Sequence, residues 1–196
     1  MQAATLRPVD SFRWIAVALS MLLGIGVTRL LAAGVSVFRS RTHARLDWIP
    51  LVWAVCVFLW QIQFWWAIVE LGSIVEVWTL DRFLLLVALA LSLFVAAALV
   101  LPPNELAPGD DLRAAFERDG RWALVALSLY FVLALLVDWK LWSISPWSVE
   151  GAYLAALIVL PIVAIAARRR RTQALVALAY LPLSVAAALH LSPSSY

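Results

Sequence analysis

The chain has 196 residues, of which 65% are hydrophobic and only 14% charged, and it has a net charge of +3 and a mean hydropathy of +0.94. A soluble domain is roughly half apolar and about a quarter charged, and a chain this short cannot bury so many apolar side chains in its own core. The composition therefore excludes a soluble domain. No basic tail indicates a nucleic-acid partner, and membrane lipids are the expected surroundings.

Six apolar segments follow one another along the chain, each near the about 20 residues that a membrane-spanning helix needs. Their apolar runs are continuous, whereas the strands of a membrane barrel alternate in polarity, so helices are indicated. The expected spans are residues 12–35, 48–70, 81–101, 121–139, 150–167 and 173–191. We therefore expect an all-α integral membrane protein in which residues 1–196 form a single domain, a bundle of six transmembrane helices with short loops.

The first segment carries small residues at every fourth position. Ser20, Gly24 and Thr28 are the centre of this series, which runs from Ala16 to Ser36. Small side chains let helix backbones approach closely in lipid, so the series predicts a helix-packing seam. Its partner is either another helix of the chain or a second copy, and we expect a homo-oligomer.

Arg29 lies near the end of the same segment. An arginine near a helix end ordinarily extends its guanidinium to the headgroups. The alternative is a paired arginine, with Asp47 or Glu117 as the partner. A signal peptide is a poorer interpretation of this segment, because Arg29 interrupts it and charges of both signs precede it.

One helical face of the second segment combines aromatic and polar residues and ends in Gln63 and Glu70, with Gln61 off the face. Polar side chains in hydrocarbon ordinarily face the bundle interior or a wet cavity, so Gln63 and Glu70 are candidates for an ion pathway. The alternative is that Gln61 and Gln63 form hydrogen bonds between helices. The members of this face are Trp53, Cys56, Trp60, Gln63, Ala67 and Glu70.

Local signals predict helix starts on either side of the third span. Ser73 and Glu76 match a capping box that would open this span early. In the linker of residues 102–121, apolar residues at helical spacing follow Asp110 and Asp111. They predict a short amphipathic helix on the cytoplasmic interface, with one of these aspartates as its N-cap.

The basic residues divide unevenly between the two ends of the predicted bundle. Ten arginines occupy the loops after the first, third and fifth spans, whereas the opposite side has three arginines and Lys140. The positive-inside rule places the ten in the cytoplasm, so both termini are expected in the periplasm or outside the cell. Fourteen of the fifteen basic residues are arginine, as is typical of GC-rich bacterial genomes, and a bacterial inner membrane is the expected location.

Tryptophan and acidic residues gather at the expected outer end. Glu70 and Asp138 belong to this group, and an acidic mouth would concentrate cations. The alternative is that acids accumulate where arginines are excluded, while the tryptophans form an interfacial belt.

No nucleotide-binding, metal-binding or catalytic motif occurs in the sequence. The two histidines, His43 and His190, fall at opposite ends of the bundle and do not supply a haem pair, and the one cysteine, Cys56, lies in an apolar run. We therefore expect no enzyme activity, no catalytic residue, no cofactor and no metal site.

Three stretches carry a resemblance to other proteins: residues 24–31, 60–66 and 111–116. Together they resemble a group of uncharacterised bacterial six-span inner-membrane proteins over most of the chain. The resemblance implies the fold and the location, and it carries no activity.

Two functions fit these features. The first is a small channel or transporter for cations, with Gln63, Glu70 and Asp138 along the ion pathway. The second is a non-transporting membrane protein, which would be an accessory subunit, a lipid-binding scaffold or a sensor. A transporter needs polar groups near the bilayer midplane, and this sequence has few.

Overall fold

A computed structural model describes residues 8–74, 78–137, 139 and 148–191, and within these ranges it contains helices and no strand. The expected all-α fold is therefore confirmed. The long helices are α1 (Pro8–Arg39), α2 (Trp48–Ile74), α3 (Leu80–Leu99), α5 (Arg121–Val137), α6 (Val149–Ala166) and α7 (Arg170–Leu191). The short elements are the 3-10 turn η1 (Ser40–Thr42), the helix α4 (Leu112–Ala115) and the π-helical turn η2 (Phe116–Gly120).

Five helices of the described chain are long and apolar enough to cross a membrane. They are α1, α2, α3, α7 and the continuous helix Leu112–Val137 formed by α4, η2 and α5. The sixth predicted span is also helical, as α6, but its apolar stretch Gly151–Ala166 is shorter. These lengths are compatible with a multipass membrane protein, and the count of six spans stays a prediction.

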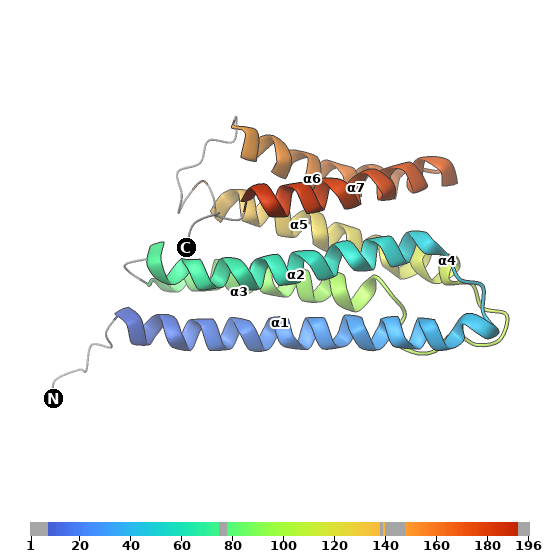
Figure 1. The fold of residues 1–196 in the computed structure, drawn as a ribbon, viewed down its shortest axis with the longest axis horizontal. Helices are drawn as coiled ribbons and strands as arrows, with labels where there is room; N and C mark the ends of the chain where they lie inside the picture. The colour runs from blue at the N-terminus through green and yellow to red at the C-terminus, as the bar shows by residue number, and fades with distance from the viewer. Residues whose placement is uncertain (1–7, 75–77, 138, 140–147, 192–196) are drawn as a thin grey trace.

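The long helices close into a ring. Successive helices along the chain run in opposite directions, with α1 and α6 at opposite edges of the bundle (Figure 1). Around the ring, the neighbours follow the order α1, α3, α5, α6, α7 and α2, and α2 also contacts α3. The ten arginines lie in the connections after α1, α3 and α6 or in the helical turns beside them, and these connections all lie at one end of the bundle, which we call the arginine-rich end.

Asp111 is the N-cap of α4, as one of the two alternatives predicted. Its carboxylate accepts a hydrogen bond of 2.9 Å from the backbone N–H of Arg113. The helix that it starts differs from the expected separate interfacial helix, because α4 continues through η2 into α5 without a break. A position on the membrane interface stays a prediction for these turns.

The predicted early start of the third span is wrong. Residues up to Ile74 still belong to α2, and α3 begins only at Leu80, after the extended residue Thr79. Ser73 therefore lies in the last turn of one helix and does not cap the next, and Glu76 lies outside the described residues. The apolar content of α2 continues past Glu70, which is why the helix does not end there.

The buried face of α1 is not the predicted seam. A Cβ added at Gly24 would meet no atom of the described chain within 4 Å, Ser20 is half-buried and Thr28 is exposed. Positions spaced strictly by four turn by about 40° at each step, so they drift around the helix, whereas alternating steps of three and four stay on one side. The buried positions of α1 alternate in this way: Leu19, Leu23, Gly26, Leu30, Ala33 and Val37.

Gly26 is the glycine at which helices approach closely. A Cβ on Gly26 would overlap the side-chain amide of Gln61 in α2 and would lie 3.7 Å from the Cα of Phe94 in α3. Gly24 and Thr28 thus face away from the other described helices, and packing of the seam of Ser20, Gly24 and Thr28 against a second copy stays a prediction.

We predict that Gly26→Ala lowers the free energy of unfolding by about 1 kcal/mol, the low end of the cost of overpacking, because the end of the buried Gln61 side chain must move to admit the added methyl. Gly24→Ala and Gly34→Ala are matched controls in the same helix, since each has open space at the Cβ position. These controls should be neutral or stabilising by up to about 1 kcal/mol. SDS titration in mixed micelles measures the difference, and equal behaviour of the three variants would contradict the close approach at Gly26.

Candidate functional site

Aromatic side chains fill the centre of the helix ring. The ring centroid of Trp60 in α2 lies 4.7 Å from that of Phe131 and 6.4 Å from that of Tyr130, both in α5. The ring centroid of Trp53 lies 4.7 Å from that of Tyr180 in α7. The indole N–H of Trp60 donates a 3.3 Å hydrogen bond to the hydroxyl of Ser184, which also belongs to α7. These residues are all buried. At this level the space between α2, α5 and α7 is therefore closed by packing.

Gln61 holds a buried amide at the junction of α1, α2 and α3. Its side chain is only 1% exposed, and neither amide atom has a hydrogen-bond partner among the described residues. An orphaned buried amide is costly and calls for an explanation, such as a bound water or ion. The sequence placed Gln61 off the polar face of α2, whereas the structure buries Gln61 and leaves Gln63 half-buried.

The three residues of the predicted ion pathway are only partly described. Gln63 is half-buried in α2 and takes part in an interaction there. Glu70 belongs to the same helix, but its side chain lies outside the described residues, as does the whole of Asp138. The ion pathway therefore stays a prediction.

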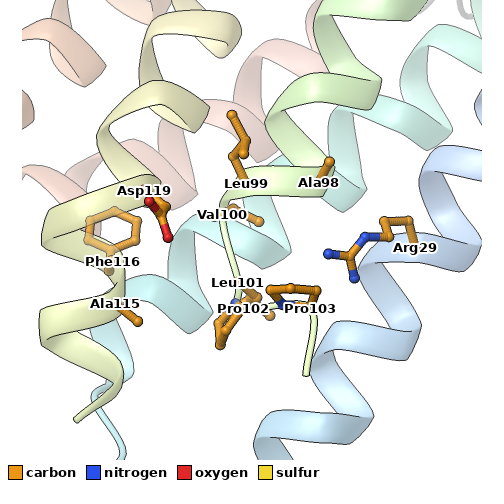
Figure 2. Close-up of a pocket in the computed structure, with 10 residues that line it drawn as sticks. All are labelled: Arg29, Ala98, Leu99, Val100, Leu101, Pro102, Pro103, Ala115, Phe116 and Asp119. Atoms are coloured by element: carbon orange, nitrogen blue, oxygen red, sulfur yellow. The ribbon is translucent and has the colours of Figure 1, made fainter. Parts of the chain in front are cut away.

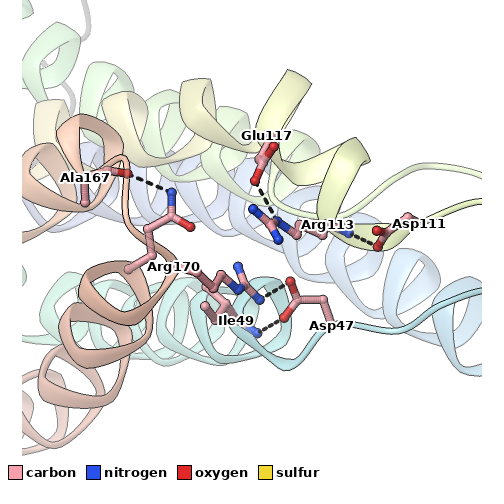
Figure 3. Close-up of polar contacts among 8 residues, drawn as sticks. Asp47, Ile49, Asp111, Arg113, Glu117, Ala167 and Arg170 are labelled. Carbon is pink, nitrogen blue, oxygen red and sulfur yellow. Dashed lines mark hydrogen bonds and ion pairs between the residues drawn. The ribbon is translucent and has the colours of Figure 1, made fainter.

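A polar network ties α2 to α7 at the arginine-rich end (Figure 3). The carboxylate of Asp47 is 8% exposed. One of its oxygens accepts a 3.0 Å hydrogen bond from the backbone N–H of Ile49 at the start of α2. The other oxygen pairs with the guanidinium of Arg170 at the start of α7. Close by, Arg113 pairs with Glu117 at 2.8 Å on the surface of α4 and η2.

Backbone hydrogen bonds join the loop after α1 to the loop after α3. The N–H of Arg45 donates to the carbonyl of Asp110 at 2.9 Å, and the N–H of Leu112 donates to the carbonyl of Arg45 at 3.0 Å. The hydroxyl of Ser40 accepts from the N–H of Leu106 at 2.9 Å. The arginine-rich end is thus a fixed structure, which holds the start of α4 against the end of α1.

A cavity of about 260 Å3 lies between α1, the end of α3 and the turns of α4 and η2 (Figure 2). Its walls are mostly apolar, from the last residues of α3, the Pro102-Pro103 pair and the ring of Phe116. Two charged side chains complete the lining: Arg29 from α1 and Asp119 from η2, on opposite sides. The cavity exists because α3 stops before the proline pair while α1 continues past it.

Arg29 does not have either of the partners that the sequence suggested. Asp47 pairs with Arg170 and Glu117 with Arg113, and no ion pair of the described residues includes Arg29. Its guanidinium faces the cavity instead, with Asp119 on the far wall (Figure 2). The arrangement provides a half-buried cation with apolar surroundings, which is suited to binding an anionic group.

The π-helical turn shapes one wall of this cavity. A Cβ on Gly120 would overlap the ring of Phe116, so the glycine lets this ring lie flat against the helix. Such turns carry one residue more than an α-helical turn and occur frequently at functional sites. Sequence reasoning found the helix start at Asp111 but had no signal for the wider turn, and it therefore did not identify Asp119.

A second, shallow hollow of about 640 Å3 runs along the outer face of α1. Gly24, Thr28 and Ala32 form its floor, and Arg29 lines both this hollow and the cavity. The small residues singled out in the sequence therefore line a shallow surface hollow that also includes the arginine.

No family model matches the chain, and no curated protein and no solved structure matches it. The resemblance to bacterial six-span proteins accordingly stays a prediction. No group of His, Cys, Asp or Glu side chains that would hold a metal ion occurs in the described part of the chain. The geometry around Arg29 is therefore the basis for a functional proposal.

We predict that aromatic packing at the ring centre contributes more to the free energy of unfolding than the hydrogen bond between Trp60 and Ser184 does. Trp60→Ala should lower the free energy of unfolding by about 3–5 kcal/mol, because it removes the contacts with Tyr130 and Phe131 and leaves a cavity. Ser184→Ala should cost only about 0.6 kcal/mol, the average for hydrogen bonds between membrane helices. Unfolding in mixed micelles tests both variants, and equal losses would show that the hydrogen bond dominates.

Proposed function

We propose that the chain is a six-span protein of a bacterial inner membrane and binds a phospholipid at Arg29, as a lipid-binding scaffold or sensor and not as a channel. The observation that carries the proposal is the guanidinium of Arg29, which faces a mostly apolar cavity and belongs to none of the described ion pairs. The aromatic centre formed around Trp60 supports it, because the ring of helices is packed at the level where an ion path would run.

The depth of Arg29 in α1 supports a bound counter-ion. Arg29 precedes the end of α1 at Arg39 by ten residues, which is about 15 Å along the helix axis. A charge held below the membrane surface is costly unless it reaches water or pairs with an opposite charge, and such residues commonly mark functional sites. A phosphate matches the planar donors of a guanidinium and can take two hydrogen bonds from it.

The surroundings of Arg29 suit the apolar part of a lipid as well. The shallow hollow over α1 is mostly apolar, and it extends from Arg29 back to Gly24 and Met21, so an acyl chain can lie along it while the phosphate meets the guanidinium. Ten arginines at this end make it the cytoplasmic side in our proposal, so the bound lipid belongs to the cytoplasmic leaflet. Self-association through the same face of α1 is an alternative use of this hollow, because a second copy packed there would occupy the position of the acyl chain.

Arg29→Gln should weaken phospholipid binding by about tenfold or more, because charge-assisted hydrogen bonds are worth about 1.5–3 kcal/mol and about 1.4 kcal/mol is a factor of ten. Native mass spectrometry of the detergent-purified protein counts the phospholipids that remain bound as the collision energy rises. Arg171→Gln is the matched control, since Arg171 is an exposed arginine of the same end and lies away from the cavity.

The control variant should keep the lipid as the wild type does. Equal retention by the wild type and Arg29→Gln would contradict the proposal, and so would equal losses in both arginine variants. A thermal unfolding curve of Arg29→Gln close to that of the wild type separates loss of binding from loss of folding.

Cation transport is the second candidate, and the orphaned amide of Gln61 favours it. A buried oxygen and nitrogen without partners in the described chain, near the middle of α2, would be satisfied by a water or an ion in transit. In this proposal, Glu70 collects cations at the outer end, Asp138 lies in a more peripheral position, and Gln63 lies along the ion pathway.

If cations pass, Glu70→Gln should reduce cation flux into liposomes and weaken the selectivity over anions, because it removes charge and keeps the side chain's shape. Asp138→Asn should have the smaller effect. Flux is measured with a panel of cations in protein-containing and protein-free vesicles. Equal flux in both kinds of vesicle would exclude transport and leave lipid binding as the remaining proposal.

A further inference from the structure

We propose that the phospholipid bound at Arg29 is an aminophospholipid, whose phosphate pairs with Arg29 and whose primary ammonium pairs with Asp119. This inference rests on the lipid-binding function proposed above and names the headgroup. Its basis is the pair of opposite charges on opposite walls of one cavity of about 260 Å3, with no ion pair between them among the described residues (Figure 2).

Asp119 retains capacity for a second donor. Its side chain is 51% exposed, and its described ion pair is with Arg118, the next residue before it. Both hydrogen bonds from Arg118, each 3.0 Å long, end on the same oxygen, Oδ2. A carboxylate has two oxygens and about four lone-pair sites, so Oδ1 retains the capacity to accept from an ammonium.

The surrounding structure fixes the two charges relative to each other. Arg29 belongs to the regular helix α1, and Asp119 belongs to the π-helical turn that continues α4, whose start is held by the Asp111 cap and by backbone bonds to Arg45. The ring of Phe116, seated on Gly120, occupies the wall beside Asp119. The two charges are therefore already in place before a zwitterionic headgroup binds, and the protein loses little conformational entropy on binding.

Other headgroups satisfy only half of this arrangement. A phosphatidylglycerol has the phosphate for Arg29, but its neutral glycerol headgroup offers no cation to Asp119. A phosphatidylcholine carries a positive charge, but its trimethylammonium has no N–H to donate. The primary ammonium of a phosphatidylethanolamine supplies both the charge and the hydrogen bonds.

The test is a competition between headgroups in nanodiscs that contain equal amounts of phosphatidylethanolamine, phosphatidylglycerol and phosphatidylcholine with identical acyl chains. Native mass spectrometry of the released full-length protein gives the ratio of retained headgroups. The wild type should prefer phosphatidylethanolamine by about two- to fivefold, the ratio that corresponds to a partly exposed ion pair. Asp119→Asn should bring the ratio close to one while the total retained lipid stays near the wild-type amount.

Glu105→Gln is the control variant, because Glu105 is an exposed acid of the same end, pairs with Arg39 and does not line the cavity. It should keep the wild-type preference. A wild type without preference, or a preference that survives Asp119→Asn, would overturn the headgroup assignment. In either case Arg29→Gln still reports separately on lipid binding itself, since it lowers the total retained lipid only if the proposed function holds.

A soluble competitor distinguishes a lipid from a free phosphate ester. Glycerophosphoethanolamine carries the same headgroup without acyl chains, and it should not displace the retained lipid at an equal concentration. Displacement at that concentration would show that the headgroup alone is bound, which would overturn the assignment of a membrane lipid.

Discussion

The side chain of Trp60 is the contact on which the ring of helices depends. Lipid is as apolar as the helices, so burial of apolar surface does not drive them together, and association relies on close packing and a few hydrogen bonds. Trp60 supplies both, because its indole contacts two aromatic rings of α5 and donates to Ser184 of α7. Without this side chain, α2 would lose its aromatic contacts with α5 and its side-chain hydrogen bond to α7 in the middle of the ring.

A filled centre leaves the ends and the outer faces as the places where charges can lie. At the arginine-rich end, Asp47 joins the start of α2 to that of α7, and its second oxygen satisfies a backbone N–H of α2. A buried ion pair stabilises a protein only when such additional hydrogen bonds compensate for lost hydration. Asp47 meets this condition, whereas Arg29 does not have an equivalent partner in the described chain. For this reason the cavity beside Arg29 says more about function than the ion pair of Asp47 does.

The helices were predictable from the sequence because apolar runs of membrane length have few alternatives, and Asp111 was predictable because a cap is a local signal. The packing details were not. Which of Gly24 and Gly26 meets α2, and which of Gln61 and Gln63 is buried, depends on how each helix is rotated about its own axis. The residue patterns selected Gly24 and Gln63, whereas the contacts of α1 with α2 and α3 involve Gly26 and Gln61.

The cavity illustrates a second limit of sequence reasoning. Arg29 and Asp119 lie ninety positions apart, and they share a cavity because the loops around Arg45 and Asp110 are joined by backbone bonds. Sequence reasoning offered Asp47 and Glu117 as partners because both fall on the expected cytoplasmic side. That argument selected the correct end of the bundle, but it could not choose among the acids there, since side-chain pairing at that end is decided by the positions of Arg113 and Arg170.

The π-helical turn has a consequence for how this region can change. The turn from Phe116 to Gly120 holds one residue more than an α-helical turn would, and this extra residue sets the rotation of α4 relative to α5. Removing a single residue here would restore a regular helix and turn α4 by about 100° about the shared axis. The acid and the aromatic wall would then leave the cavity together, while α5 would keep its place in the ring. Homologous chains that differ in length by one residue at this point would therefore share the helix bundle and differ in the side chains that line the cavity beside α1.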